Sequence, residues 1–366
     1  MTVSTQQPSL AKAVLRKGWR TTQLAHTLLT ASLPRSHEVP RVFYGGARSG
    51  DLGGPLVKIK RLQRHFPPFP WTYNMAYLLS NAPYLPGLAI DWLKLNRIPL
   101  ILNQNGVFYP GWYAGDWQGQ NTIMAKAYHR ADHVFWQSEF CKRSADRFLG
   151  QRSGDGEVLF NAIDTDHFSP ARGSLDRPLT FLITGKIGIH LSYRLTSTIE
   201  GFAMACRSGL DARLNIAGWV EDVASVRAMV ARYCDVDRVS ILGPYTQENA
   251  PLVYTGADVY VMTKYLDPCP NTVIEAMACG LPILYSASGG VPELVGNESG
   301  IGLPVPEDWE RIHVPPAEAI AEGMMRIADM KQSMGQAARA RAEAYFDIRK
   351  WVDRHRVVFN KLLQSV

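Results

Sequence analysis

The residues best suited to chemistry lie in a strand–loop–helix segment at positions 258–293. An apolar, β-rich run at Val259–Met262 leads into the loop Pro268–Asn271, and the helix after this loop carries Glu275. Unpaired backbone N–H groups and the positive end of the helix dipole face such a loop, so a phosphate is its natural occupant. Glu275 lies one turn into the helix, where a carboxylate can accept both hydroxyls of a ribose. The segment therefore predicts a sugar-nucleotide site.

The order of residues in this segment is also distinctive. Seven residues separate Asp267 from Glu275, the run Ala276–Pro282 follows directly, and Gly289–Glu293 reads Gly-Gly-Val-Pro-Glu. This order resembles the donor-binding segment of the retaining glycosyltransferases of family 4, which have the GT-B architecture. The resemblance implies that Glu275 binds the ribose and that Asp267 contacts the donor sugar or supports its developing positive charge. The family usually has Glu at the position of Asp267, and Pro268–Asn271 replaces a commoner Gly-aromatic-Gly loop.

Further donor contacts follow from the same resemblance. Lys186 stands after a strand–glycine junction at Gly185, where the family has Arg, and Arg194 stands near the family's Lys. Arg grips phosphate oxygens bidentately whereas Lys acts as a point charge, so the exchange preserves charge and alters geometry. A solvated surface cation is the alternative for each. The loop backbone is expected to hold sugar hydroxyls and phosphate at Pro270, Asn271 and Thr272.

The N-terminal half begins like a second nucleotide-binding domain. Arg41–Tyr44 is a short β-rich run, a glycine-rich loop follows, and Leu56–His65 has helical spacing. The resemblance implies that Gly53 and Gly54 in this loop approach the donor phosphate and the acceptor, where a side chain would hold the ligand off the backbone.

A candidate acceptor site follows the next clear strand. Pro99–Asn103 reads as a buried parallel strand, and Asn105 comes just after it, where many family members have His. By resemblance, Asn105 takes a catalytic role. Ligands gather at the carboxyl ends of parallel strands, so the aromatic loop at 108–113 is expected to supply core residues and one or two sugar-stacking rings.

Strands and helices alternate over most of the chain, which predicts an α/β fold with two Rossmann-like parallel-sheet domains. The GT-B resemblance adds that the domains face a central cleft and that a C-terminal helix crosses back to the first domain. The expected divisions are a basic helical leader, an acceptor domain, a donor domain and a C-terminal helix, at 1–40, 41–170, 171–345 and 346–366.

Composition restricts the class of protein. A chain with 46% hydrophobic and 20% charged residues is globular, and no apolar run is long enough to span a membrane. Five cysteines without C-x-x-C spacing predict buried free thiols, no zinc site and a reducing, cytoplasmic compartment.

Charge is distributed unevenly. Residues 1–150 hold 18 Lys and Arg against 7 Asp and Glu, a surplus of 11, whereas the whole chain carries +6. The basic half suggests contact with an anionic lipid, membrane face or glycan, with solubility as the alternative. The leader carries Lys12, Arg16, Lys17 and Arg20 before Leu24–Leu29. It is predicted to be a basic amphipathic segment that packs on the fold or makes peripheral contact with an anionic membrane.

The favoured function is a retaining transfer of a hexose-type sugar from a UDP- or GDP-sugar to a glycan or lipid-linked acceptor. No metal or cofactor is expected, since no H-E-x-x-H, EF-hand or D-x-D cluster of the chain argues for a metal site. The main alternative is a catalytically silent GT-B protein that binds a nucleotide sugar or a partner subunit. A GT-B epimerase would need a dense His/Glu/Asp set, and a nucleic-acid-binding role has no recognisable motif here.

Overall fold

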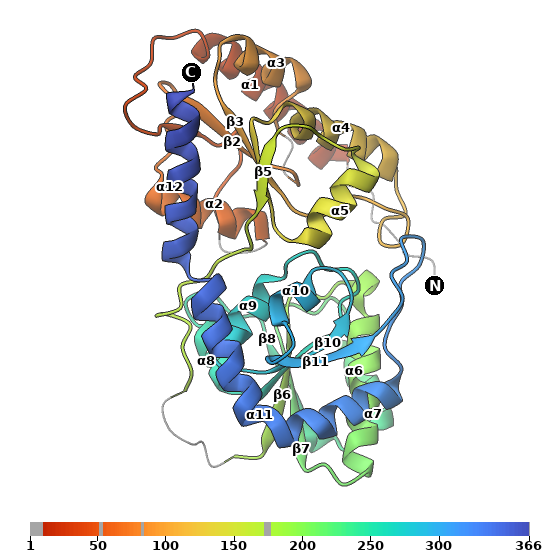
Figure 1. The fold of residues 1–366 in the computed structure, drawn as a ribbon. Coiled ribbons are helices and arrows are strands. Elements are labelled where there is room, and N and C mark those ends of the chain that lie inside the picture. The colour runs from red at the N-terminus through yellow and green to blue at the C-terminus, as the bar shows by residue number, and fades with distance from the viewer. Residues whose placement is uncertain (1–9, 51–53, 82–83, 172–176, 366) are drawn as a thin grey trace. The chain divides into compact units, whose positions relative to one another are not determined.

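The chain divides into two compact units in a computed structural model that describes residues 10–50, 54–81, 84–171 and 177–365 (Figure 1). Unit 1 comprises Met1–Phe160 together with Arg349–Val366, and unit 2 comprises Asn161–Ile348. Gly53 of unit 1 and residues 172–176 of unit 2 lie outside the described residues. Each unit is an α/β structure built on one parallel sheet.

Five parallel strands form the sheet of unit 1 in the order β1-β2-β3-β4-β5. The predicted elements around the first strand and before Asn105 are confirmed, whereas β2 was not identified from the sequence. The strands are β1 (Val42–Phe43), β2 (Met75–Leu79), β3 (Leu100–Gln104), β4 (His133–Trp136) and β5 (Asp155–Val158). The helices before and between them are α1 (Leu10–Thr30), α2 (Gly54–His65), α3 (Gly87–Leu95), α4 (Trp117–Arg130) and α5 (Glu139–Phe148).

The C-terminal helix α12 (Ile348–Gln364) packs on unit 1, as the sequence predicted. Its buried residues Trp351, His355 and Phe359 recur every four positions, which places them on one face of a helix. The Phe359 ring meets Phe66 edge-on at 4.8 Å between centroids. The Tyr77 hydroxyl of β2 lies 3.0 Å from Nε2 of His355. The last helix of the chain therefore completes the core of the first unit.

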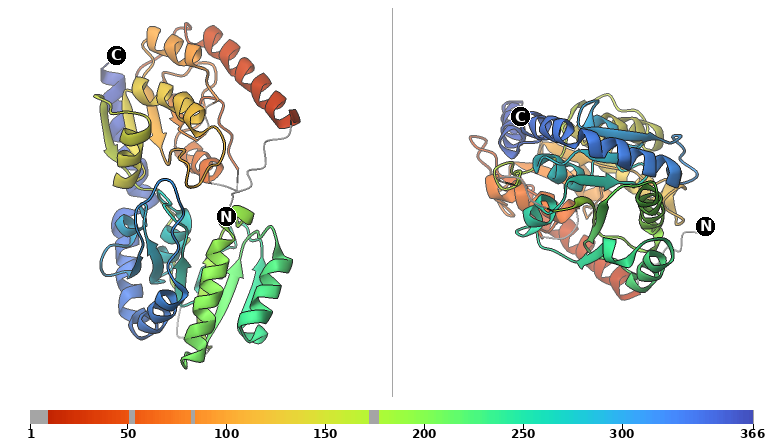
Figure 2. Two further views of the ribbon diagram at one scale, coloured as in Figure 1. Left: turned by 90° about the vertical axis from the view of Figure 1, so that its right-hand side faces the viewer. Right: turned by 90° about the horizontal axis from the view of Figure 1, so that it is seen from below.

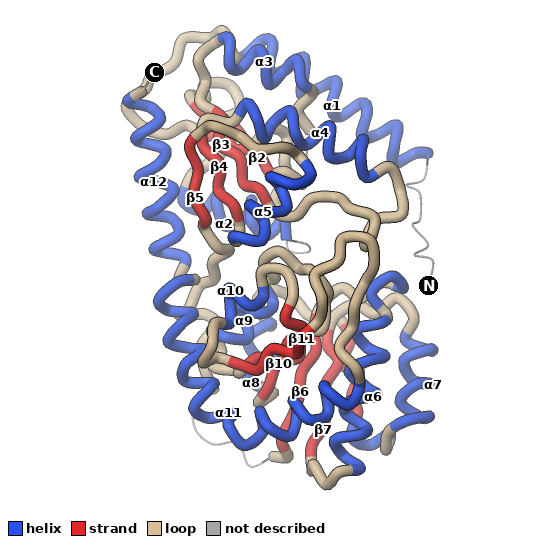
Figure 3. The backbone as a smooth tube through the Cα atoms, turned by 45° about the vertical axis from the view of Figure 1, so that its right-hand side comes forward, coloured by secondary structure: helices blue, strands red, loops and turns tan. Residues whose placement is uncertain are grey.

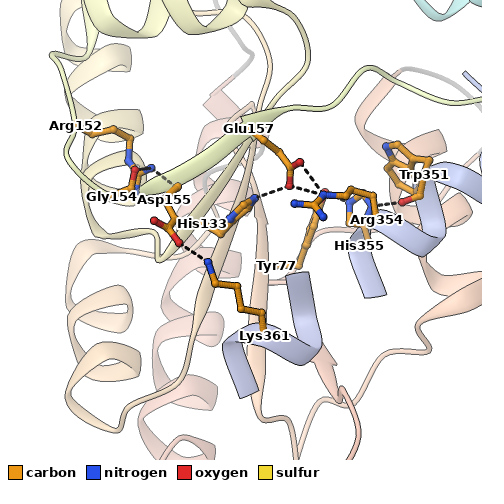
Figure 4. A network of polar contacts seen from close by, with 10 residues as sticks. All are labelled: Tyr77, His133, Arg152, Gly154, Asp155, Glu157, Trp351, Arg354, His355 and Lys361. Carbon is orange, nitrogen blue, oxygen red and sulfur yellow. Dashed lines mark hydrogen bonds and ion pairs between the residues drawn. The ribbon is translucent and has the colours of Figure 1, made fainter. Parts of the chain in front are cut away.

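Polar contacts flank this apolar face of α12 (Figure 4). The guanidinium of Arg354 donates to both carboxylate oxygens of Glu157 on β5, at 2.7 and 2.9 Å. His133 on β4 lies 3.2 Å from the same carboxylate, and Lys361 donates to Asp155 at 2.8 Å. These pairs fix the helix against the strand β5 at the edge of the sheet.

Helix α1 lies alongside α3 (Figure 2). The side of α1 that is buried is polar. The buried residues are Gln23, Thr27 and Thr30, and the Thr30 hydroxyl is 2.9 Å from that of Tyr73. The helix is thus held to the fold largely through its polar side. No helix in the described part of the chain is both long enough and apolar enough to cross a bilayer.

Six parallel strands form the sheet of unit 2 in the order β11-β10-β9-β6-β7-β8 (Figure 3). The strands are β6 (Leu179–Thr184), β7 (Ala212–Ala217), β8 (Val239–Gly243), β9 (Val259–Met262), β10 (Ile283–Ala287) and β11 (Gly300–Pro304). The α-helices are α6 (Tyr193–Arg207), α7 (Val223–Tyr233), α8 (Ala250–Thr255), α9 (Asn271–Ala278), α10 (Val291–Val295) and α11 (Ala317–Tyr345). Two short 3-10 helices are η1 (Ile189–Leu191) and η2 (Val236–Arg238).

One face of this sheet is covered by α6 and α11. Phe202 of α6 and Met324 of α11 are fully buried in the same apolar cluster as the strand residue Phe181. A Cβ at Gly201 would lie 2.5 Å from the side chain of Ile320, so glycine permits the close approach of the two helices. The predicted free thiols are confirmed, but only three are fully buried, since Cys206 and Cys234 are half-buried.

The buried histidine of α12 should make unit 1 sensitive to acid. Burial lowers the pKa of His355 to about 3, with the charges of Lys58 and His133 adding to the effect and the bond to the Trp351 carbonyl opposing it. Between that value and the ordinary 6.5, the unfolded chain binds one proton more than the folded chain. The free energy of unfolding should therefore fall as the pH drops below 6.5, by up to about 1.4 kcal/mol per pH unit.

His355→Gln should show a shallower fall than the wild type in urea unfolding followed by tryptophan fluorescence between neutral and mildly acidic pH. His37→Gln, at an exposed position, should follow the wild type. Equal pH slopes for His355→Gln and the wild type would contradict a neutral, buried His355.

Candidate functional site

The site of unit 2 lies where the strand order of its sheet reverses. Strands β6 and β9 are neighbours and pair in parallel, while the chain continues from β6 toward β7 and from β9 toward β10 on opposite sides. The loops after two such strands diverge and leave a crevice at their carboxyl ends, where ligands of open α/β sheets bind. Here those loops begin at Gly185 and Thr263. The topology thus selects the two segments that the sequence had singled out.

Asp267 is held by its own loop. Nζ of Lys264 lies 2.7 Å from Oδ2 of Asp267, and the amide of Cys269 donates to Oδ1 at 3.2 Å. The residue is only 8% exposed. Both carboxylate oxygens therefore have partners within four residues of the chain, and Leu266 takes a left-handed conformation, with φ of 47°, to make the turn.

The glycine pair predicted from the sequence supports this loop. The amide of Gly290 donates to the carbonyl of Asp267 at 2.9 Å. Gly289 has a φ of 67°, and a Cβ there would lie 2.5 Å from the same carbonyl oxygen. Only glycine fits so close to the backbone in this conformation. The Gly-Gly turn after β10 therefore fixes the loop after β9.

The start of α9 offers backbone donors toward the loop. Pro270 is the N-cap and makes no side-chain cap hydrogen bond. The amides of Val273 and Ile274 reach the Pro270 carbonyl, whereas helix geometry leaves those of Asn271 and Thr272 without a partner inside the helix. Together with the helix dipole, these amides favour an anion.

Glu275 is buried one turn into α9, at 2% exposure. The hydroxyl of Tyr254 on α8 donates to its Oε2 at 2.8 Å. Burial, followed by the negative charge of Glu275, raises the pKa of Tyr254 well above its ordinary value and that of Tyr245 to about 12. Tyr254 and Tyr245 therefore remain neutral beside this carboxylate. Neither was singled out from the sequence, because a tyrosine far from the motif carries no local signal.

The two predicted cations of the β6–α6 segment differ in environment. Gly185 has a φ of 131°, a backbone conformation that favours glycine. The next residue, Lys186, is exposed, and its Nζ lies 5.0 Å from the ring centre of Trp219. Arg194 is 3% exposed, and its Nη2 donates to the carbonyl of Thr184 at 3.3 Å. Its Nε has no hydrogen-bond partner among the described residues. Arg194 is thus a buried guanidinium beneath the carboxyl end of β6, which excludes the alternative of a solvated surface cation.

Asn105 and Gly54 belong to unit 1. Asn105 follows β3, and its Oδ1 accepts a hydrogen bond of 2.7 Å from the hydroxyl of Ser80, which follows β2. Gly54 is the first residue of α2 and is exposed, with no atom within 4 Å of a Cβ placed there. Ser80 was missed because β2 was missed.

Several buried polar groups lie near the carboxyl end of β3. Asn103 accepts hydrogen bonds from Nζ of Lys58 at 2.6 Å and from Nε2 of Gln137 at 2.8 Å. Oε1 of the fully buried Gln104 has no partner among the described residues. In the predicted aromatic loop, Tyr109 is buried as core, whereas Trp112 is partly exposed and stacks on Phe108 at 5.1 Å. The carboxyl end of this sheet can therefore offer hydrogen bonds and an aromatic face to a polar ligand.

The predicted site residues thus fall into two groups. One group surrounds the carboxyl ends of β6 and β9 in unit 2: Gly185, Lys186, Arg194, Asp267, Pro270, Asn271, Thr272 and Glu275. The other consists of Asn105 and Gly54 in unit 1. Among the residues that the structure describes, no group of three His, Cys, Asp or Glu side chains is arranged to hold a metal ion.

Comparison with known proteins agrees with this geometry. Residues 176–341 match the model of the family described as glycosyl transferases group 1. The matched residues lie entirely within the second unit. A curated relative, D-inositol 3-phosphate glycosyltransferase of Mycobacteroides abscessus, is 38% identical to this chain over 94 residues. That stretch covers 25% of this chain and 19% of the relative.

Solved structures extend the likeness of this chain to known proteins over both units. Sucrose-phosphate synthase from Thermosynechococcus elongatus has a TM-score of 0.61 at 20% identity, covering 81% of this chain and 75% of its own. Anabaena HepE in complex with UDP has a TM-score of 0.63 at 17% identity, covering 86% and 83%. HepE has also been solved with UDP-glucose. At these identities the likeness establishes the fold, which is the predicted GT-B fold of two parallel-sheet units.

Tyr254→Phe should destabilise unit 2 more than the loss of an ordinary tyrosine hydrogen bond. A bond to a buried carboxylate is worth about 2 kcal/mol, against about 1 kcal/mol for a neutral acceptor. Tyr44→Phe is the matched control, because the hydroxyl of this buried tyrosine donates to the carbonyl of Phe66 at 2.6 Å. Urea unfolding of each variant, in the transition of its own unit, measures the difference. Equal losses would argue against a charged Glu275.

Proposed function

We propose that the protein is a retaining, metal-independent glycosyltransferase that moves a hexose-type sugar from a nucleotide sugar to a glycan or lipid-linked acceptor. The observation that carries this proposal is the meeting of three features at the β6–β9 reversal. They are the free amides at the start of α9, the buried carboxylate of Glu275 one turn later, and the cations Lys186 and Arg194. A nucleoside diphosphate sugar has matching groups in the same order.

The diphosphate of the donor would lie against the amides of Asn271 and Thr272. The helix dipole and the cations Lys186 and Arg194 would stabilise its negative charge. Glu275 would accept hydrogen bonds from the ribose hydroxyls. Asp267, which lies earlier in the same loop, would face the donor sugar. Positive groups already fixed by the fold stabilise a leaving phosphate without reorganisation, so the transfer can proceed without a metal ion.

The transfer itself needs one bond made and one broken on the same face of the sugar. The acceptor hydroxyl oxygen bonds to the anomeric carbon while the bond between that carbon and the diphosphate oxygen breaks. Because the acceptor bonds to the face of the sugar that the phosphate leaves, the configuration at the anomeric carbon is kept. The leaving phosphate takes the proton of the acceptor hydroxyl, so no protein nucleophile is required. The polar groups of unit 1 near Asn105, with the partly exposed Trp112, are suited to an acceptor rich in hydroxyls.

This proposal predicts slow hydrolysis of a single donor without added metal. The protein is incubated with UDP-, GDP- and ADP-sugars in the presence of a chelator, and nucleotide release is measured. Glu275→Gln should reduce release by two orders of magnitude or so, because a neutral amide loses charge-assisted bonds to two ribose hydroxyls. Glu318→Gln makes the same carboxylate-to-amide change at an exposed position on α11, and this variant should release nucleotide as the wild type does.

Two results would contradict the proposal in different ways. Release that requires a divalent metal would exclude the metal-independent mechanism. Binding of a nucleotide sugar without release or transfer to any glycan or lipid-linked acceptor would favour the silent GT-B binding protein. Asp267, whose carboxylate is occupied by Lys264 and Cys269, is the feature that favours this second outcome.

Peripheral contact with an anionic membrane is the second part of the proposal, and α1 supports it. The helix has four basic residues and no acidic one, and it turns Leu15 and Leu29 to solvent at 72% and 71% exposure. Val14 and Leu28 are also exposed, whereas the buried face is polar. A helix that exposes apolar residues beside positive charges is suited to the interface of an anionic bilayer.

The α1 surface predicts flotation with anionic vesicles. The wild type should float with phosphatidylcholine vesicles that contain about 30% phosphatidylglycerol, and less at high salt. Leu15→Ser with Leu29→Ser should reduce flotation several-fold, because each change removes a side chain that would enter the bilayer interface. A matched double change at the exposed Leu242 and Leu252 of unit 2 should have no effect. Undiminished flotation of the α1 variant would exclude this surface as the lipid contact.

A further inference from the structure

Lys264 lies in the loop after β9 and was not among the residues singled out from the sequence. Its ammonium is fixed at 2.7 Å from Oδ2 of Asp267, and the lysine side chain remains 35% exposed. The next residue is also anchored, since the amide of Tyr265 donates to the hydroxyl of Tyr193 at 3.1 Å. The ammonium is therefore held in one place and is still accessible to a ligand.

Lys264 shares its surroundings with the cations of the neighbouring loop. The pKa of His190, in the loop after β6, is lowered first by burial and then by the positive charges of Lys264 and Lys186, while Glu221 opposes them. The positive charges of Arg194 and Lys264 also act on the hydroxyl of Tyr193. Positive side chains from both loops therefore converge at the carboxyl ends of β6 and β9.

The charged side chains of this cluster differ in how far the fold already engages them. Lys186, Arg194 and Lys264 are positive, and the carboxylates that act on the same surroundings are Asp267, Glu221 and Glu275. Glu221 is engaged by the amide of Ile189 at 2.9 Å. Arg194 is almost fully buried with Nε unpartnered, and Lys186 contacts the ring of Trp219. Lys186 and Lys264 are therefore the cations of this cluster that an anionic ligand can reach from solvent.

We propose that Lys264 binds the diphosphate of the nucleotide donor and that Asp267 acts mainly by holding this lysine in place. The inference rests on the proposed function and assigns a residue and a role to the same site. It also accounts for the short carboxylate at position 267. Asp267 reaches the ammonium three residues earlier and the amide two residues later, and both bonds lie within its own loop.

The lysine makes the diphosphate distinguishable from a monophosphate. A point charge beside the outer phosphate adds affinity for a nucleoside diphosphate and little for the matching monophosphate. UDP, GDP and ADP, each with its monophosphate, are titrated into the full-length protein by calorimetry. Lys264→Met should weaken binding of the preferred diphosphate about tenfold or more, as expected for one charge-assisted bond, and should largely spare the monophosphate. Lys264→Arg should retain most of the preference.

The double variant Lys264→Met with Asp267→Asn separates a direct contact from a simple neutralisation of charge. If Lys264 contacts the diphosphate, the double variant binds it as weakly as Lys264→Met, because the cation is still absent. If Lys264 only neutralises Asp267, removing both charges restores the affinity, and the inference is overturned. The double variant also avoids leaving a buried carboxylate unpaired, so it guards against misfolding of the single variant.

Lys331→Met is the matched control on α11, where Nζ lies 4.0 Å from Asp258, and it should bind all nucleotides as the wild type does. Failure of the folded wild type to bind any of the three diphosphates would overturn the proposed function and this inference with it. Normal binding by the wild type with an unchanged diphosphate preference in Lys264→Met would overturn the inference alone.

Discussion

The carboxyl ends of β6 and β9 lie side by side because the strand order of the second sheet reverses between them. Each strand sends its following loop away from the other, so the loops cannot cover this point. Gly185 and Arg194 come from one side of the reversal, and Asp267 and the start of α9 come from the other. A cation set and a helix N-terminus can meet here because the chain leaves these two neighbouring parallel strands toward opposite sides of the sheet.

Burial of charge is the second constraint on this site. Glu275 is kept in an apolar helix by the hydroxyl of Tyr254, and Asp267 by Lys264 and a backbone amide. A buried carboxylate without such donors would be protonated or would destabilise the unit. The same partners orient the oxygens, so the groups that make burial tolerable also set the geometry available to a ligand.

Unit 1 depends on the end of the chain for its core. Phe359 and His355 fill the space beside Phe66 and Tyr77, and Arg354 pairs with Glu157 at the sheet edge. The first unit therefore cannot bury its apolar face until the second has been synthesised. Residues 1–160 expressed without the C-terminal helix would therefore expose this face.

The sequence by itself determined the alternation of strands and helices, the loop and helix start between Asp267 and Glu275, and the Gly-Gly turn at Gly289. These features are local: hydrophobic period, glycine conformations and helix starts are set by residues close in the chain. The two-unit parallel-sheet fold followed from the same patterns. Strand β2 was not predicted from the sequence, and neither was the role of Ser80, which follows it.

Only the tertiary structure decided which distant side chains complete the site. Tyr254 reaches Glu275 across 21 positions, Ser80 reaches Asn105 across 25, and the Asn161 side-chain amide reaches the Cys269 carbonyl across 108. The burial of Arg194, and the convergence of Lys264 with the cations after β6, likewise depend on the pairing of β6 with β9. Such pairings are set by packing between segments far apart in the chain, and no local pattern of residues encodes them.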